Sequence, residues 1–115
     1  INCCCEEKLS TINIEWQNQK SLCVVLCADG YPNNYKKNIQ LDNLENVKLD
    51  ENQFIFHAGT KLINDRIVSS GGRVLNIVSL SNGFKEGKKK TYNILENLNL
   101  KDAFYRKDIG FKVID

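Results

Sequence analysis

A run of β-branched and aliphatic residues from Arg73 to Leu80 constrains the fold more than any other part of the sequence. The run is too rich in Val, Leu and Ile for a strand with one face in water, so it predicts a central strand with both faces covered. Gly71-Gly72 breaks the chain before this strand, and Ser81 or Asn82 is suited to cap a helix after it. A central strand needs neighbours, which the other apolar segments must supply.

Two segments on the N-terminal side are candidates for these neighbours. Ile12, Ile14 and Trp16 alternate with polar residues, and residues 22–28 form a continuous apolar run. A period of two and a short apolar run are both typical of β-strands. We therefore expect two strands joined by the polar loop at 17–21.

The middle of the sequence predicts an irregular stretch followed by a second hairpin. Turn-forming residues gather at 29–34, and the polar stretch that follows them is expected to be irregular. The β signal resumes at 54–57. The segments 61–63 and 66–69 then flank Asn64-Asp65, two residues that tolerate the left-handed geometry of a tight hairpin turn.

One helix is predicted after the central run, because Phe84, Thr91, Leu95 and Leu98 fall close to helical spacing. Its lysines favour a solvated face over a phosphate-binding patch; they are Lys85, Lys88, Lys89 and Lys90. Together these elements predict an α+β domain, mostly antiparallel β-sheet with one principal helix packed on it.

The first residues have a different character from the rest. Three consecutive cysteines followed by Glu6-Glu7-Lys8 are typical of the last turns of a helix. We therefore expect residues 1–10 to be the tail end of a preceding domain and residues 11–115 to form one domain. A chain of 115 residues with 42% hydrophobic content has room for one core only.

Charge and hydropathy exclude several classes of partner. The chain carries 16 basic and 14 acidic side chains, a net charge of +2, whereas a dedicated nucleic-acid binder concentrates basic charge on one surface. No apolar stretch approaches the roughly 20 residues that cross a bilayer, and the start does not resemble a signal peptide. We expect a cytoplasmic protein that binds neither nucleic acid nor membrane.

The cysteines are predicted to be reduced and free of metal. Their number is odd, and three of the five are consecutive, which suits neither a disulfide framework nor regular ligand spacing. Cys23 and Cys27 are separated by three residues, but the apolar residues between them place both along a strand. Free Cys at such positions commonly behaves as a small hydrophobe, so no metal site is expected.

Two glycine-bearing loops are the candidate binding sites, and no catalytic residue stands out. One is Gly71-Gly72-Arg73, where glycines let a ligand approach the backbone and a guanidinium offers a planar fork to a phosphate or carboxylate. The alternative is a plain bulge or turn in which Arg73 pairs with a carboxylate of the chain. The other loop contains His57, Gly59 and Thr60. A lone His beside aromatic strand residues is more often structural than catalytic.

Five short motifs follow one another along the chain. They are the strand at 23–28 leading into Gly30-Tyr31-Pro32, Tyr35 with Lys37, residues 56–60, residues 71–75, and residues 105–110. In this order and spacing they resemble the C-terminal domain of the glycinamide ribonucleotide synthetase, or phosphoribosylamine–glycine ligase, family. The chain departs from the family's pattern at Asn38, where Gly is usual. Asn is the next best residue at positive φ, so the loop is expected to survive.

The resemblance implies a part in de novo purine biosynthesis. The family joins phosphoribosylamine to glycine with ATP and Mg²⁺, through a glycyl phosphate intermediate. Its ATP-grasp and N-terminal domains are expected to be the partners of this chain, with residues 1–10 as the end of the ATP-grasp domain. Those domains carry the nucleotide and metal ligands, so no cofactor is expected on this chain alone, and the isolated chain is expected to be inactive.

The same resemblance assigns roles to individual residues. Gly71, Gly72 and Arg73 would hold the glycine carboxylate or the developing acyl phosphate, both of which are anions. His57 and Thr60 would be secondary substrate contacts or supports of that loop. Arg106 and Asp108 are more suited to fixing the C-terminal segment than to touching substrate.

Two alternatives remain open at this point. A free-standing regulatory module would use the same glycine loops to bind a small anion. A weaker alternative is an OB-like nucleic-acid module, suggested by Tyr31, Phe54 and Phe56 near lysines, but aromatic residues in strands are normally core.

Overall fold

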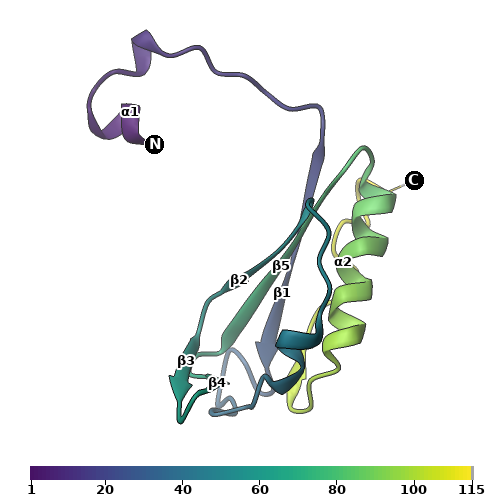
Figure 1. Cartoon of the computed structure of the whole chain (residues 1–115). Helices are drawn as coiled ribbons and strands as arrows, with labels where there is room; N and C mark the ends of the chain where they lie inside the picture. The colour runs from purple at the N-terminus through teal and green to yellow at the C-terminus, as the bar shows by residue number, and fades with distance from the viewer. Residues whose placement is uncertain (115) are drawn as a thin grey trace.

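The computed structural model describes residues 1–114, and its central feature is a four-stranded antiparallel sheet with the order β2-β5-β1-β6 (Figure 1). A separate two-stranded sheet pairs β3 with β4. The elements are α1 (Asn2–Cys5), η1 (Leu9–Thr11), β1 (Lys20–Ala28), η2 (Asp42–Asn46), β2 (Gln53–His57), β3 (Thr60–Ile63), β4 (Arg66–Ser69), β5 (Arg73–Ser81), α2 (Phe84–Leu98) and β6 (Ala103–Phe104). Both η segments are 3₁₀ helices. The predicted α+β class, a mostly antiparallel sheet with one principal helix, is confirmed.

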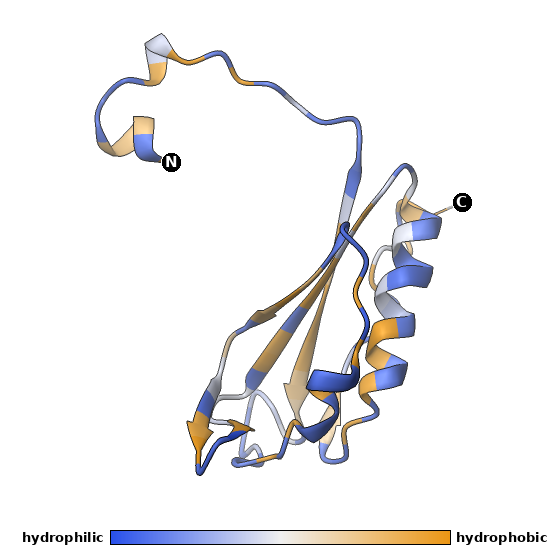
Figure 2. Cartoon of the chain, in the orientation of Figure 1, coloured by the Kyte–Doolittle hydropathy of each residue, from blue (hydrophilic) through white to orange (hydrophobic). Residues whose placement is uncertain are grey.

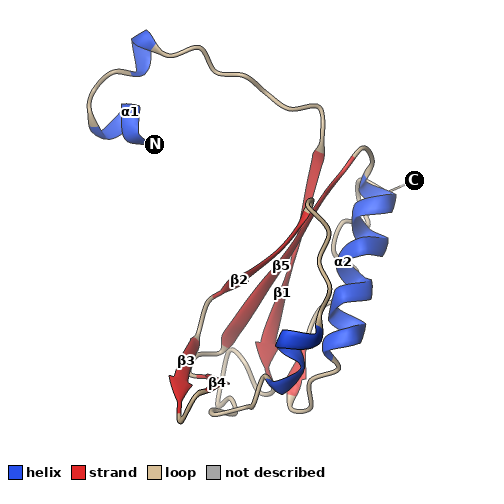
Figure 3. Ribbon diagram, in the orientation of Figure 1, coloured by secondary structure: helices blue, strands red, loops and turns tan. Residues whose placement is uncertain are grey.

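The core lies between α2 and one face of this sheet (Figure 3). Alternate side chains of β1 and β5 point toward α2 and are buried, since strand residues two apart share a face; they include Leu22, Val24, Leu26, Leu75 and Ile77. The helix contributes Ile94, Leu95 and Leu98. In Figure 2 the strands are mainly hydrophobic whereas α2 is mixed, as expected for a helix with one face in water.

β5 is confirmed as a central strand, but only one of its faces is fully covered. Its residues toward α2 are buried, while Asn76, Val78 and Leu80 on the opposite face are half-buried. On the same face Phe54 and Phe56 are exposed, with their rings 6.0 Å apart. The prediction that both faces of this strand are covered was therefore too strong, because apolar composition does not show whether another layer packs on each face of the sheet.

The start of α2 differs from the prediction that Ser81 or Asn82 would cap it. The N-cap is Gly83, and no side chain bonds to the first turn. Ser81 instead ends β5, and its hydroxyl donates to the carbonyl oxygen of Gly83 at 2.8 Å. One turn later Gly87 is buried, and a Cβ added there would lie 2.7 Å from the Ser81 Oγ. Glycine stabilises a helix less than Ala does, but here the missing side chain of Gly87 lets α2 pack closely on the sheet.

The β3–β4 hairpin is confirmed together with its turn. Asn64 and Asp65 have φ values of 49° and 60°, and the strands pair from Thr60–Ser69 to Ile63–Arg66. Two consecutive residues with positive φ match the twist of the strands that they join.

The prediction of a strand over Ile12, Ile14 and Trp16 is wrong. No strand lies between Thr11 and Lys20, and the segment extends away from the sheet (Figure 1). Ile14 and Trp16 are 58% and 88% exposed. The alternation of apolar residues is present, but a strand also needs a neighbour for its backbone groups, and the described part of the chain places none beside this segment. The loop predicted at 17–21 therefore joins no hairpin, and its last two residues belong to β1.

The stretch between β1 and β2 is irregular, as predicted, yet it is tied to the hairpin. Asn38 has φ of 58°, which confirms that this position needs positive φ. The next residue, Ile39, donates its backbone N–H to the buried Ser69 Oγ at 2.9 Å, and Leu41 N–H donates to Ile67 O at 3.0 Å. These bonds hold the loop along β4.

The C-terminal segment is fixed to α2 and to the loop after β1. Arg106 and Asp108 form a double hydrogen bond, Nε to Oδ1 at 2.9 Å and Nη2 to Oδ2 at 2.5 Å. Tyr92 of α2 donates its hydroxyl to the Arg106 carbonyl at 2.6 Å, and Lys36 pairs with Asp102. The structural role predicted for the Arg106 pair is consistent with these contacts. Within residues 1–114 no helix has the length and apolar character needed to cross a bilayer.

Candidate functional site

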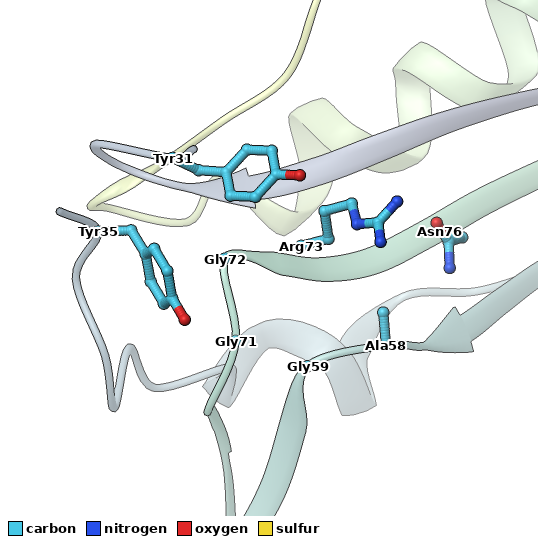
Figure 4. A pocket seen from close by; sticks show the side chains of 8 residues that line it. All are labelled: Tyr31, Tyr35, Ala58, Gly59, Gly71, Gly72, Arg73 and Asn76. Atoms are coloured by element: carbon cyan, nitrogen blue, oxygen red, sulfur yellow. The ribbon is translucent and has the colours of Figure 1, made fainter. Parts of the chain in front are cut away.

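A cavity of about 580 Å³ lies where the loop after β1 meets the start of β5 (Figure 4). It is lined by Tyr31, Tyr35, Ala58, Gly59, Gly71, Gly72, Arg73 and Asn76. These residues come from three segments far apart in the sequence: the loop after β1, the β2–β3 connection, and the β4–β5 turn with the first residues of β5. The site therefore exists only in the folded chain.

Two of these segments touch through their glycines. Gly59 N–H donates to Arg73 O at 2.8 Å, and Gly59 O accepts from Ser70 N–H and Gly71 N–H at 2.8 and 3.2 Å. A Cβ added to Gly59 would lie 2.6 Å from the Gly71 Cα and 2.7 Å from the Arg73 carbonyl oxygen. No larger residue fits there without a shift of backbone, so the glycine is required by the approach of the two loops.

The third segment closes the cavity through Tyr31. Its ring packs on Gly72, where an added Cβ would lie 2.2 Å from the ring carbon Cδ2. The Ala28 N–H donates to Gly72 O at 2.8 Å, which continues the contact between β1 and the β4–β5 turn. Beside it the β1–β5 register skips Val74, so that Cys27 lies opposite Arg73. Such a bulge at a strand end changes the direction of the side chains next to it.

Among the residues that the structure describes, the cavity lining has one cationic side chain and no acidic one. Arg73 is exposed and forms no salt bridge within residues 1–114, so the alternative in which it pairs with a carboxylate of the chain is not supported by its contacts. The charge of Arg73 affects the pKa of the Cys27 thiol. Burial raises this pKa, and the Arg73 guanidinium lowers it by a smaller amount. A second cation, Lys37, lies 5.8 Å from the centre of the Tyr35 ring. The arrangement is suited to an anion.

The predicted site residues divide into two groups. Gly71, Gly72 and Arg73 line the cavity together. His57 and Thr60 do not; the His57 Nδ1 lies 2.9 Å from the Thr60 Oγ1, which joins the ends of the β2–β3 connection. Their role as secondary substrate contacts stays a prediction. The hydrogen bond between them is consistent with the alternative role, in which they support the loop.

Three polar residues of the lining were not predicted as site residues. Tyr31 and Tyr35 belong to two of the five family motifs, but nothing in the local sequence shows that they line the same cavity as Arg73. Asn76 carries a clearer signal, because it is the one amide in the apolar run from Val74 to Leu80. A polar side chain in such a run calls for a partner or a ligand.

Metal ligands are not gathered anywhere in the described chain. Residues 1–114 contain no group of three or more His, Cys, Asp or Glu side chains close enough to hold a metal ion. All five cysteines are free thiols in the structure.

Comparison with known proteins gives a consistent result. Residues 21–112 match the family model described as phosphoribosylglycinamide synthetase, C domain. The chain is 40% identical over 105 residues to the phosphoribosylamine–glycine ligase of Caldanaerobacter subterraneus, covering 91% of this chain and 24% of that protein. It is 39% identical over 114 residues to the enzyme of the same name from Escherichia coli K12, covering 96% and 26%.

More distant similarity extends to a eukaryote and to a solved structure. The bifunctional purine biosynthetic protein purD of Dictyostelium discoideum is 35% identical over 114 residues, covering 97% of this chain and 14% of that protein. The crystal structure of phosphoribosylamine–glycine ligase from Thermotoga maritima superposes with a TM-score of 0.65 at 31% identity, covering 78% of this chain and 22% of that chain. The chain thus spans about a quarter of the length of the first curated relatives that it matches.

Proposed function

We propose a function from one premise: this chain belongs to the phosphoribosylglycinamide synthetase C-domain family. Its relatives are several times longer, so the activity belongs to a larger protein of which this domain is one part. That protein joins phosphoribosylamine to glycine with ATP, forming glycinamide ribonucleotide in a cytoplasmic step of purine biosynthesis. The domain supplies substrate contacts and works with the ATP-grasp and N-terminal domains of the same enzyme.

The cavity at Arg73 is the part of this domain that we propose to face the substrates. The supporting observation is a guanidinium that forms no salt bridge within residues 1–114, at a cavity whose eight described lining residues include no acidic side chain. Gly71 and Gly72 keep the backbone open beside it, and Arg73 holds an anionic group of a substrate. A charge-assisted contact of this kind positions the substrate and stabilises charge that develops during the reaction.

ATP and Mg²⁺ do not fit the described part of this chain. It contains no cluster of acidic side chains for a divalent cation, and no glycine-rich loop of the P-loop kind. We therefore place both in the remainder of the full-length enzyme.

Replacement of Arg73 by Ala in the full-length enzyme tests this proposal. Loss of one charge-assisted contact should cost about 2 to 4 kcal/mol of transition-state stabilisation, roughly 30- to 1000-fold in kcat/KM, with little change in melting temperature. Arg66→Ala is the matched control, since Arg66 is also an exposed arginine at the start of a strand but lies on the β3–β4 hairpin. A folded Arg73→Ala enzyme with wild-type kinetics toward both glycine and phosphoribosylamine would rule out the proposed role.

The isolated chain provides an independent test. Because the described residues 1–114 show no ligand set for a divalent cation and the sequence has no P-loop, we expect that the isolated chain neither hydrolyses ATP nor forms glycinamide ribonucleotide. Formation of an ATP-dependent product by this chain alone would contradict the proposal that ATP and Mg²⁺ bind in the remainder of the full-length enzyme.

A further inference from the structure

The size of the cavity bears on which substrate group it takes. Its volume of about 580 Å³ falls within the roughly 300 to 1,000 Å³ that is usual for sites of drug-sized ligands. Glycine, the smallest amino acid, would leave most of this space to water. A phosphorylated pentose fills much more of it and presents many more atoms to the lining.

The charges of the lining point in the same direction. Free glycine carries an ammonium group as well as a carboxylate, and a buried or partly buried ammonium is normally matched by an acidic side chain. None of the eight lining residues is acidic, whereas Arg73 is cationic. A phosphate monoester has negative charge to match the guanidinium and no ammonium to leave unpaired.

Neutral polar groups complete the lining. Tyr31, Tyr35 and Asn76 have side chains that both donate and accept hydrogen bonds. None of the three makes a side-chain hydrogen bond to another residue among 1–114, and Figure 4 shows them around the same cavity as Arg73. Neutral donor and acceptor pairs are suited to sugar hydroxyls, which have the same dual character.

From these observations we infer that the cavity takes the phosphorylated ribose of the amine substrate, with the phosphate at Arg73 and the sugar hydroxyls at Asn76 and the two tyrosines. The inference rests on the proposed function and narrows it. It assigns this pocket to phosphoribosylamine and leaves the glycine carboxylate to another part of the enzyme.

Equilibrium binding to the full-length enzyme tests the inference without turnover. The probes are ribose 5-phosphate, ribose and glycine, measured by isothermal titration calorimetry with wild type, Arg73→Ala and the control Arg66→Ala. Arg73→Ala should weaken binding of ribose 5-phosphate by about 10- to 100-fold, the loss expected for hydrogen bonds to a charged group, and leave glycine binding unchanged. Ribose, which has no phosphate, should bind weakly to all three proteins.

Asn76→Asp gives a sharper version of the test, because it keeps the shape of the side chain and adds a negative charge to the cavity lining that contains Arg73. A phosphate would be repelled, so affinity for ribose 5-phosphate should fall by at least about tenfold, and the KM for phosphoribosylamine should rise with that for glycine unchanged. If the pocket held glycine instead, the new carboxylate would pair with its ammonium and glycine affinity would rise.

The outcomes separate this inference from the function on which it rests. If Arg73→Ala weakens glycine binding and spares ribose 5-phosphate, the inference is overturned while an anion-binding role for Arg73 stands. If Arg73→Ala changes neither affinity nor kcat/KM, both fail. Loss of ribose 5-phosphate affinity in Arg73→Ala and Asn76→Asp, with Arg66→Ala unchanged, supports the inference.

Discussion

Gly59 and Gly71 pack so closely that a Cβ on Gly59 would lie 2.6 Å from the Gly71 Cα, whereas a Cβ on Gly71 would lie 3.1 Å from the Gly59 Cα. This contact joins the β2–β3 connection to the β4–β5 turn, and both segments line the cavity at Arg73. The two positions are therefore unequal: the backbone around Gly59 has no room for a methyl group, and that around Gly71 has a little.

Alanine at these positions should give a graded loss of stability. We expect Gly59→Ala to lower the free energy of unfolding by about 1 to 3 kcal/mol, the usual cost of overpacking, and Gly71→Ala to lower it less. Gly83 has open space around its Cα, so Gly83→Ala is the control and should change stability by under about 1 kcal/mol. Urea denaturation of the three variants measures the order; equal effects at Gly59 and Gly83 would refute the packing argument.

The interface of α2 with the sheet contains two hydroxyls without partners. The Ser79 Oγ and Thr91 Oγ1 are buried and make no hydrogen bond in the described chain. Because such groups lose their bonds to water on folding, Ser79→Ala and Thr91→Val should leave stability unchanged or raise it by up to about 1 kcal/mol.

Ser69→Ala is the matched control for these two variants. Ser69 is equally buried, but its Oγ accepts the backbone N–H of Ile39 at 2.9 Å. Its removal leaves a buried donor unpaired and should cost about 1 to 3 kcal/mol. A thermal melt that ranks Ser79→Ala below Ser69→Ala in stability would contradict this distinction.

The thiol of Cys27 should report the charge on Arg73. Burial raises the pKa of Cys27, and the nearby guanidinium opposes this rise, so removing it in Arg73→Ala should raise the pKa further. Less thiolate is then present at a given pH, and alkylation of Cys27 by iodoacetamide at pH 8.5, about the pKa of a free thiol, should slow.

Cys23 is the internal control for that experiment. Its pKa is raised by burial alone, so its alkylation rate should be the same in wild type and Arg73→Ala. Peptide mass spectrometry distinguishes the two sites in one sample. A rate at Cys27 that does not respond to Arg73→Ala would mean that the guanidinium does not act on this thiol.

The ion pair at the C-terminal segment should appear in the titration of Asp108. Hydrogen bonds from Arg106 lower the pKa of this carboxyl, so its favourable effect on the segment is present above about pH 4, the ordinary value for Asp, and is lost as the pH falls through the lowered value. Proton–carbon NMR of the carboxyl should give a midpoint below that of an Asp in an unstructured peptide. In Arg106→Ala the midpoint should move up; an unchanged midpoint would show that Arg106 is not the cause.

Elements defined by neighbouring residues were predictable from the sequence. The apolar run of β5 and the Asn64-Asp65 turn follow from local side-chain preferences, whereas the positive φ of Asn38 was expected from the family pattern, in which Gly is usual at that position. The family motifs also directed attention to Gly71, Gly72 and Arg73, which do line one cavity. Each of these features can be predicted from a short stretch of the sequence.

Other features depend on what lies opposite a residue, which the local pattern does not contain. The segment from Ile12 to Trp16 has the period of a strand, but within residues 1–114 no strand lies beside it. The helix glycine at position 87 is required by the close approach of Ser81 in the facing sheet. The contact between Gly59 and Gly71, the register that skips Val74, and the grouping of Tyr31, Tyr35 and Asn76 around Arg73 likewise arise between distant segments. The sequence alone determined the family of this protein and most of its elements, whereas tertiary packing decided which predicted strand finds a neighbour and which side chains share the cavity, because distances between segments far apart in the chain are set only when the sheet and its loops close.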